Sequence, residues 1–151
     1  MKRLFSAFVI LTMCVLLTAC GAKEAKSADL AAVLGKFPMS GDMMSLTEED
    51  MLDFYGISAE DMKQFAAAVN GTGIRCDEYV LIEAVDTDAA GRVKTALDNR
   101  YQEKLNQMDG YLPDEYAVIK ACSVEQDGNY VTMIVAENAE KLTKLYQESF
   151  K

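Results

Sequence analysis

Residues 76–108 read CDEYVLIEAVDTDAAGRVKTALDNRYQEKLNQM and decide the fold, because two different periodicities meet within them. Residues 79–82 are apolar at consecutive positions, which predicts a strand over residues 76–85 that is buried on both faces. From residue 87 the apolar side chains recur at helical spacing instead, so we expect a helix over residues 87–108. Its buried stripe should comprise Val93, Leu97, Tyr101, Leu105 and Met108.

Downstream of this helix, the sequence predicts two further strands and a last helix. Residues 116–124 and 130–136 read as strands, and the polar turn between them predicts a hairpin. The long helix should return the chain to the start of the sheet, so strands 76–85 and 116–124 are expected to run parallel. The third strand is expected to lie between the other two, and a helix over residues 138–150 then completes a split β-α-β-β-α order.

Upstream, two expected helix starts share one pattern. Thr47 and Ser58 each follow an apolar residue and precede, by three positions, an acid that resembles the second half of a capping box. We therefore expect an N-terminal helical pair, with one helix ending at Gly56 and the other running from Ser58 to about Val69. The predicted fold class is α+β, with a single domain over residues 29–151 in which helices cover a three-stranded, mostly antiparallel sheet.

The N-terminus predicts export and lipid attachment. Two basic residues precede an apolar stretch over residues 4–16, and Leu17, Thr18, Ala19 and Cys20 then match a lipobox. The alternatives are an ordinary signal peptide and a transmembrane helix, but the stretch is shorter than the roughly 20 residues that a span needs. We expect a signal peptide over residues 1–19, followed by a lipidated cysteine and flexible tether over residues 20–28. The protein should therefore sit on the extracytoplasmic face of the cell membrane, with a diacylglyceryl or palmitate anchor on Cys20.

The composition excludes several classes of function. The formal charge is −9, and it becomes −11 once the two cations of the leader, Lys2 and Arg3, are removed. A domain this acidic would approach nucleic acid against its own electrostatic field, so no nucleic-acid partner is expected. The chain has no His, and so lacks the usual general base, zinc ligand and partner of a catalytic Ser or Cys. We expect no enzymatic activity, no catalytic or metal-binding residues, and no cofactor apart from the covalent lipid.

Three short stretches carry a resemblance to a known family. They are Tyr101-Gln102 in the long helix, residues 111–116 (Tyr-Leu-Pro-Asp-Glu-Tyr), and residues 128–131 (Gly-Asn-Tyr-Val) at the start of the last strand. Together with the lipobox, they resemble the domain of unknown function 4358 family, which consists of short uncharacterised lipoproteins common in Gram-positive anaerobes. The resemblance covers roughly residues 46–150. It implies a surface lipoprotein with no established activity, no known cofactor and no catalytic residues to carry over.

The two cysteines left in the lipidated domain, Cys76 and Cys122, invite a disulfide in an oxidising compartment. If their strands run parallel, however, the thiols lie at opposite ends of the sheet, about 20 Å apart at roughly 3.3 Å per residue. A disulfide needs Cα atoms within about 7 Å of each other. We therefore expect buried free thiols and keep the Cys76–Cys122 disulfide as the disfavoured alternative.

Acidic stretches suggest cation sites but fit helix starts better. Residues 86–91 place acids at the first and third positions of a calcium-type loop, yet Ala90 and Leu97 stand at its fifth and twelfth positions, where ligands are required. The expected role of Asp86 or Thr87 is therefore to cap the long helix. The acids at 48–50 and 60–61 are expected to be solvated first turns.

A weak candidate binding surface remains around the loop that follows the long helix. Exposed aromatic loop residues often mark binding sites, although the same residues can simply pack over the edge of a sheet. Two functions stay open: a non-catalytic domain that binds an envelope protein, which is preferred, and a lipoprotein that captures or senses a small ligand in a pocket near this surface. A monomer is expected. The candidate surface comprises Arg100, Tyr111, Pro113, Glu115 and Tyr116.

Overall fold

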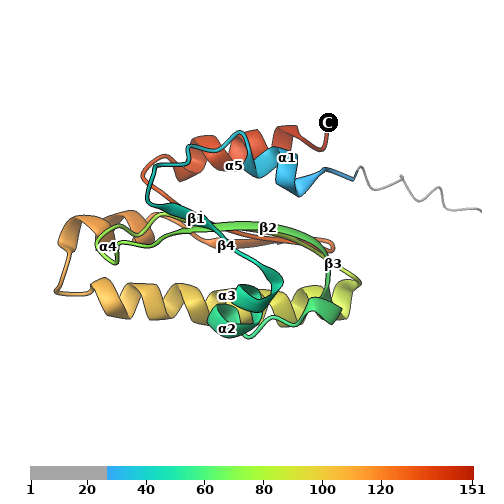
Figure 1. Cartoon of the computed structure of the whole chain (residues 1–151), viewed down its shortest axis with the longest axis horizontal. Helices are drawn as coiled ribbons and strands as arrows, with labels where there is room; N and C mark the ends of the chain where they lie inside the picture. The colour runs from blue at the N-terminus through green and yellow to red at the C-terminus, as the bar shows by residue number, and fades with distance from the viewer. Residues whose placement is uncertain (1–26) are drawn as a thin grey trace, which may run out of the picture.

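The computed structural model of the chain describes residues 27–151. The predicted signal peptide over residues 1–19, the lipobox with Cys20 and most of the expected tether over residues 20–28 therefore lie outside the described residues. Figure 1 shows three layers, with one sheet between two sets of helices.

The central layer is a five-stranded sheet in which every pair of neighbouring strands is antiparallel. Its order is β1-β2-β3-β5-β4, so β1 and β4 form the two edges and β3 lies at the centre. Every residue of β3 is buried, as expected for a strand that is covered on both faces. The strands are β1 Met43–Ser45, β2 Met62–Asn70, β3 Glu78–Ala84, β4 Val124–Asp127 and β5 Tyr130–Val135.

Helices cover both faces of this sheet (Figure 1). The α2/α3 layer consists of α2 (Glu48–Tyr55) and the long α3 (Thr87–Met108), and the α1/α5 layer on the other face consists of α1 (Leu30–Leu34) and α5 (Ala139–Glu148). A further helix, α4 (Pro113–Lys120), lies at the end of the sheet beyond the end of α3. A single 3-10 turn, η1 (Ala59–Asp61), links α2 to β2.

Each face of the sheet has its own hydrophobic core. Beneath α3, the side chains of Val93 and Leu97 pack with those of Val80 and Ile82 from β3. Beneath α5, Leu142 and Tyr146 join a second cluster that contains residues of α1. Each face of β3 lies against a helix layer. This explains why its residues are apolar except for two acids, Glu78 and Glu83, whose charges are paired with cations.

The structure confirms the α+β class and the helix over residues 87–108, but the predicted three-stranded sheet is wrong. The largest error concerns residues 58–69, where we expected the second helix of an N-terminal pair. Ser58 caps only the short turn η1, and the chain then enters β2. Along β2, Phe65 and Ala67 face the α2/α3 core while Ala66 and Ala68 face the other core. Alanine favours helices locally, but pairing with two neighbouring strands and burial on both faces override that preference.

The second error concerns residues 116–124, which were expected to form a strand parallel to residues 76–85. Residues Pro113–Lys120 instead form α4, with Pro113 at its first turn, where the missing N–H of proline costs nothing. The strand begins only at Val124. It has the same direction as β3 but is not its neighbour, because β5 lies between them, as expected for the third strand. The three-residue edge strand β1 was also missed.

Candidate functional site

Arg100 is the one basic residue of the predicted binding surface. Its side chain points towards the buried carboxylate of Glu78. Its Nε lies 3.0 Å from Oε1 of Glu78 and its Nη2 lies 3.1 Å from Oε2, so the two side chains form a bidentate pair. Glu78 is the first residue of β3 and its side chain is completely buried. The guanidinium also lies 5.5 Å from the centre of the Tyr55 ring. Arg100 therefore joins α3 to the sheet and to the end of α2.

Two further groups complete this cluster around Glu78. The Nζ of Lys104 lies 2.7 Å from Oε2, and the Tyr55 hydroxyl donates a hydrogen bond of 2.8 Å to Oε1. Burial acts to raise the pKa of Glu78, but Lys104 and Arg100 outweigh it and hold that pKa below its usual range. Burial, followed by the negative charge of Glu78, raises the pKa of Tyr55. At neutral pH the carboxylate is therefore ionised and Tyr55 is neutral, so the Glu78 cluster is a charged structural anchor.

Glu115, the predicted acid of the same surface, also has structural partners. Its Oε2 accepts a 2.8 Å hydrogen bond from the backbone N–H of Cys76, and its Oε1 lies 3.1 Å from Nη1 of Arg75. These contacts hold the start of α4 against the segment that leads into β3. Burial, and then Glu115, raise the pKa of the Cys76 thiol to about 12. This thiol is therefore protonated at neutral pH and is a poor nucleophile.

Cys76 and Cys122 are both free thiols, with Cys76 buried and Cys122 half-buried. Our expectation that they lie at opposite ends of the sheet was wrong. Each lies two residues before a strand, and because those two strands have the same direction, both cysteines lie at the end of the sheet where β5 finishes. The Cys122 thiol donates to the Val118 carbonyl at 3.2 Å. Since β5 separates β3 from β4, the two cysteines flank that strand on either side.

The remaining residues of the predicted surface do not form a pocket with Arg100 and Glu115. Tyr111 and Pro113 are exposed, and Tyr116 is half-buried, with Lys120 located 5.5 Å from the centre of its ring. Four shallow hollows occur elsewhere on the part of the chain that the structure describes, and none of the four is lined by any residue of the predicted surface. Of these five residues, Arg100 and Glu115 therefore act as structural anchors, and the other three are exposed or half-buried.

The acidic stretches act at helix starts. Asp86 caps α3, because its Oδ1 accepts a 2.8 Å hydrogen bond from the Ala89 N–H. Asp50 and Thr47 form the expected capping box of α2. Asp61, in η1, pairs with Arg92 of α3, whose Nε lies 3.2 Å from Oδ2. Within residues 27–151, no three His, Cys, Asp or Glu side chains are grouped in a way that could hold a metal ion.

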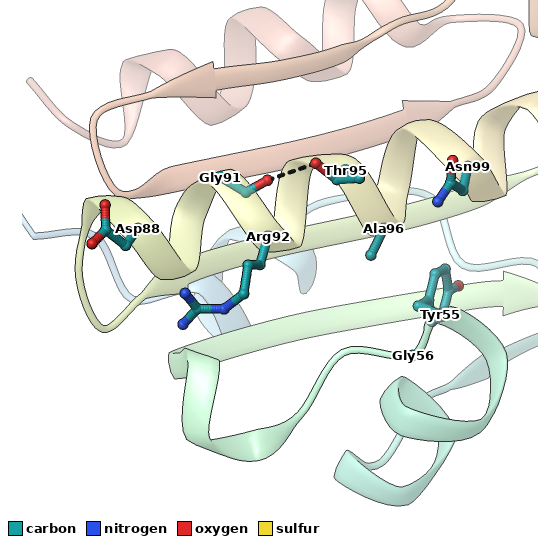
Figure 2. A pocket seen from close by; sticks show the side chains of 8 residues that line it. All are labelled: Tyr55, Gly56, Asp88, Gly91, Arg92, Thr95, Ala96 and Asn99. Atoms are coloured by element: carbon teal, nitrogen blue, oxygen red, sulfur yellow. Dashed lines mark hydrogen bonds between the residues drawn. The ribbon is translucent and has the colours of Figure 1, made fainter.

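A groove between α2 and α3 is the better candidate for a functional site (Figure 2). Gly56, with φ of 67°, ends α2 in the left-handed conformation that favours glycine, and Tyr55 then points towards α3. On the α3 side, the small residues Gly91 and Ala96 leave the groove shallow and open, and Thr95 turns its hydroxyl back to the Gly91 carbonyl at 2.9 Å. The groove is lined by Tyr55, Gly56, Asp88, Gly91, Arg92, Thr95, Ala96 and Asn99.

Two large apolar side chains are exposed on the helix that supplies Tyr55 to this groove. Leu52 and Phe54, which precede the groove residue Tyr55 in α2, have exposed fractions of 55% and 48%. Sequence reasoning missed them because it looked for the buried stripe of each helix. The available signal was that Met51 and Tyr55, at helical spacing, already account for the buried side of α2. Leu52 and Phe54 lie on the two flanks of that buried side, where α2 leaves them exposed.

The surroundings of Leu52 and Phe54 are acidic. Glu48, Glu49 and Asp53 are exposed on the same helix. Asp88, at the N-terminal end of α3, also lines the groove. Arg92, the cation that lines the groove, is paired with Asp61. We refer to Leu52, Phe54 and the groove together as the α2/α3 surface. This surface therefore combines exposed apolar side chains with several acids.

Comparison with known proteins places the chain in a family but adds no activity. No helix among residues 27–151 is long and apolar enough to cross a membrane. No curated protein and no solved structure matches the chain. A family model described as a domain of unknown function, DUF4358, matches residues 37–136, which include all five strands and the α2/α3 surface. The chain therefore belongs to the DUF4358 family.

Proposed function

We propose that the protein is a lipid-anchored domain on the extracytoplasmic face of the membrane, and that it serves as a non-catalytic accessory that binds a protein partner. The α2/α3 surface is the proposed binding face. The observation that carries this proposal is the exposure of Leu52 and Phe54 on one short helix beside an open groove. Large apolar side chains that stay exposed beside an open groove are a feature of protein interfaces.

The form and charge of the surface favour a particular kind of partner. Small-molecule sites enclose most of their ligand, whereas this groove is open along its length and suits a segment laid across it. The acids at Glu48, Glu49 and Asp53 would favour a partner with basic residues at its rim. We therefore propose that the partner presents an amphipathic segment with apolar residues along one side and Lys or Arg beside them.

The alternative function, capture or sensing of a small ligand, receives less support. It was expected to use a pocket near Arg100 and the residues from Tyr111 to Tyr116. Arg100 is held by Glu78 and Glu115 is held by Arg75 and the Cys76 N–H. A ligand at Arg100 would have to break its pair with the buried Glu78, and breaking a buried pair typically costs about 3–5 kcal/mol. A ligand at Glu115 would have to displace Arg75 and the Cys76 N–H.

Site-specific photocrosslinking in intact cells tests the binding face. A photoreactive phenylalanine analogue placed at Phe54 should give one discrete adduct with a protein, whereas the same analogue at Tyr111, an aromatic position with an exposed fraction of 66%, should not. Adding Leu52→Glu should abolish the adduct from position 54. Adding Ile74→Glu, at an apolar position of similar exposure far from α2 in the sequence, should leave it intact. Equal adducts from positions 54 and 111 would contradict the proposal.

The anchor requires a separate test, because a correct binding face does not prove lipidation. Cys20→Ser should abolish incorporation of labelled palmitate, whereas Cys122→Ser should leave it unchanged. Undiminished palmitate incorporation into the Cys20→Ser chain would exclude Cys20 as the lipidated residue. A thermal-shift screen with sugars, peptides and anionic metabolites tests the alternative function, because a ligand at 100 times its dissociation constant stabilises the folded state by about 2.7 kcal/mol. A saturable shift with a small metabolite would favour that alternative.

A further inference from the structure

We propose that the α1/α5 layer lies against the membrane surface and that Lys36, Lys141 and Lys144 contact anionic lipid headgroups. This inference rests on the lipid anchor proposed above and adds to it an orientation of the domain. Three independent features of the chain support it: the distribution of charge between the layers, the grouping of the three lysines, and the short length of chain between the anchor and the domain.

Charge is divided unequally between the two sides of the molecule. The segments that carry α1 and α5, residues 27–37 and 137–151, contain four basic and four acidic residues and are neutral overall. Residues 38–136 contain seven basic and nineteen acidic residues, a net charge of −12. A negatively charged bilayer would repel most of the molecule but not the α1/α5 layer. The orientation of lowest electrostatic energy therefore has this layer towards the lipid.

The lysines of this layer are gathered around one place. Lys36, just after α1, and Lys141 and Lys144 of α5 line the same shallow groove, and all three are exposed. Lys144 pairs with Glu140 at 2.7 Å, but the two side chains have exposed fractions of 67% and 86%, so solvent screens the pair and Lys144 can exchange partners easily. Glu148 is the acid that lines this groove. Among the residues that line the groove, three are cations and one is an acid, which makes the groove itself attractive to phosphate-bearing headgroups.

The short tether enters the domain through the α1/α5 layer and so holds this layer within reach of the membrane. Ala28 is buried in the core beneath α1, and its carbonyl accepts a 3.0 Å hydrogen bond from Nε2 of Gln64, so the domain begins in the α1/α5 layer. Between Cys20 and Ser27 there are seven residue steps. At most about 3.6 Å each, they reach no more than about 25 Å. The opposite layer lies about 20 Å farther away, because each packed layer adds about 10 Å.

Electrostatic interactions decide the orientation at these distances. The Debye length is about 8 Å at physiological ionic strength, so only the layer nearest the lipid experiences the surface potential strongly. In the proposed orientation, the three lysines lie within this distance while the acids of α2 and α3 lie beyond it. The α2/α3 surface then points away from the membrane, where a partner protein can reach it.

The test uses the full lipidated chain in phosphatidylcholine vesicles, with and without phosphatidylglycerol, and with a nitroxide quencher on the lipid headgroups. A fluorophore is attached through Gln147→Cys on α5 or Gln102→Cys on α3, both exposed positions, in a Cys122→Ser background. Cys76 is buried, and the lipid occupies the sulfur of Cys20. We expect several-fold stronger quenching at position 147 than at position 102 when phosphatidylglycerol is present, and a smaller difference without it.

Matched charge variants show whether the lysines cause the difference. Lys141→Gln and Lys144→Gln each remove one lysine charge. Each should lower the ratio of the proposed orientation to the reversed one about fivefold. Lys94→Gln removes an equivalent i,i+4 pair on α3, where Lys94 lies 2.7 Å from Asp98, and should change nothing. Equal quenching at the two positions, stronger quenching at position 102, or an equal effect of Lys94→Gln would overturn the proposal.

Flotation and mass spectrometry of the same samples distinguish this proposal from the one on which it rests. If the chain floats with vesicles and carries acyl groups on Cys20 but the two positions are quenched equally, only the proposed orientation fails. If Cys20 carries no lipid and the chain does not float, the proposed anchor fails and the orientation fails with it.

Discussion

The two faces of the sheet are held by different chemistry. On the α1/α5 face, aromatic rings meet edge to face: Phe37 with Tyr79 at 5.3 Å, and Phe150 with Tyr130 and Tyr146 at 4.8 and 5.0 Å. On the α2/α3 face, aliphatic side chains surround the Glu78 cluster. Ring contacts tolerate small shifts, whereas a buried carboxylate with three partners has one satisfactory arrangement. The α2/α3 face should therefore be the more sensitive one to single polar substitutions.

The largest effect is expected from Glu78→Ala. The substitution leaves Arg100 and Lys104 partly or fully buried without a counter-charge, and removing one partner of a buried pair typically costs about 3–5 kcal/mol of unfolding free energy. Urea denaturation measures this. Glu83→Ala, on the same strand, is the control, because Glu83 pairs with Lys63, whose exposed fraction is 60%, and should cost less. Equal costs for the two variants would show that the Glu78 cluster has no special role.

The same cluster predicts how acid affects stability. The pKa of Glu78 is lowered in the folded state, so the unfolded state binds the proton more readily as pH falls. The stabilisation is complete above the unfolded value, about 4.3, and is lost as pH falls through the lower folded value. Urea midpoints measured from pH 7 to pH 3 should fall for the wild-type chain and should fall less for Glu78→Gln. Parallel curves would assign the acid sensitivity to other carboxylates.

Two tyrosines make a matched pair across the sheet. The Tyr55 hydroxyl donates to the Glu78 carboxylate at 2.8 Å, whereas the Tyr79 hydroxyl donates to the Pro38 carbonyl at 3.3 Å on the other face. Hydrogen bonds to charged groups contribute about 1.5–3 kcal/mol and neutral ones about 0.5–1.5 kcal/mol. Tyr55→Phe should therefore lower the unfolding free energy more than Tyr79→Phe does. The reverse order would mean that the aromatic face is the more demanding one.

The smallest effects are expected from surface ion pairs in the two layers. Lys94→Gln in α3 and Lys144→Gln in α5 each remove one i,i+4 pair between exposed or half-exposed side chains. Each should change the unfolding free energy by no more than about 0.5 kcal/mol. A loss above 1 kcal/mol in urea denaturation for either variant would indicate a role in packing and would make that variant unsuitable as a test of membrane orientation.

Local sequence signals predicted some elements well. The helix over residues 87–108 could be read because its apolar stripe is long, and because Asp86 caps its start as expected. Strand β3 could be read from four consecutive apolar residues. In contrast, β2 combines a helix-like start at Ser58 with three alanines, and only its pairing with β1 and β3 makes it a strand. β3 follows β2 after residues 71–77 and β1 precedes α2, so both partners lie outside the stretch whose local pattern resembles a helix.

The candidate site shows the same limit. Arg100 and Glu115 were predicted to belong to a binding surface, but in the structure they contact Glu78 and the Cys76 N–H, which come from a different part of the chain. A stronger signal was present in α3, where Lys104 lies seven residues after Leu97 and therefore close to the buried stripe. A lysine near a core stripe and a glutamate in an apolar strand predict each other, because neither can be buried alone.

The edges of the sheet have a consequence for the behaviour of the protein when many copies are close together. One edge strand, β1, is only three residues long, and the other, β4, carries Glu125 and Asp127 in its four residues. Short or negatively charged edges offer little template for another chain to extend the sheet. Copies crowded side by side should therefore resist cross-β polymerisation, so that even a dense population of the protein remains a collection of separate molecules.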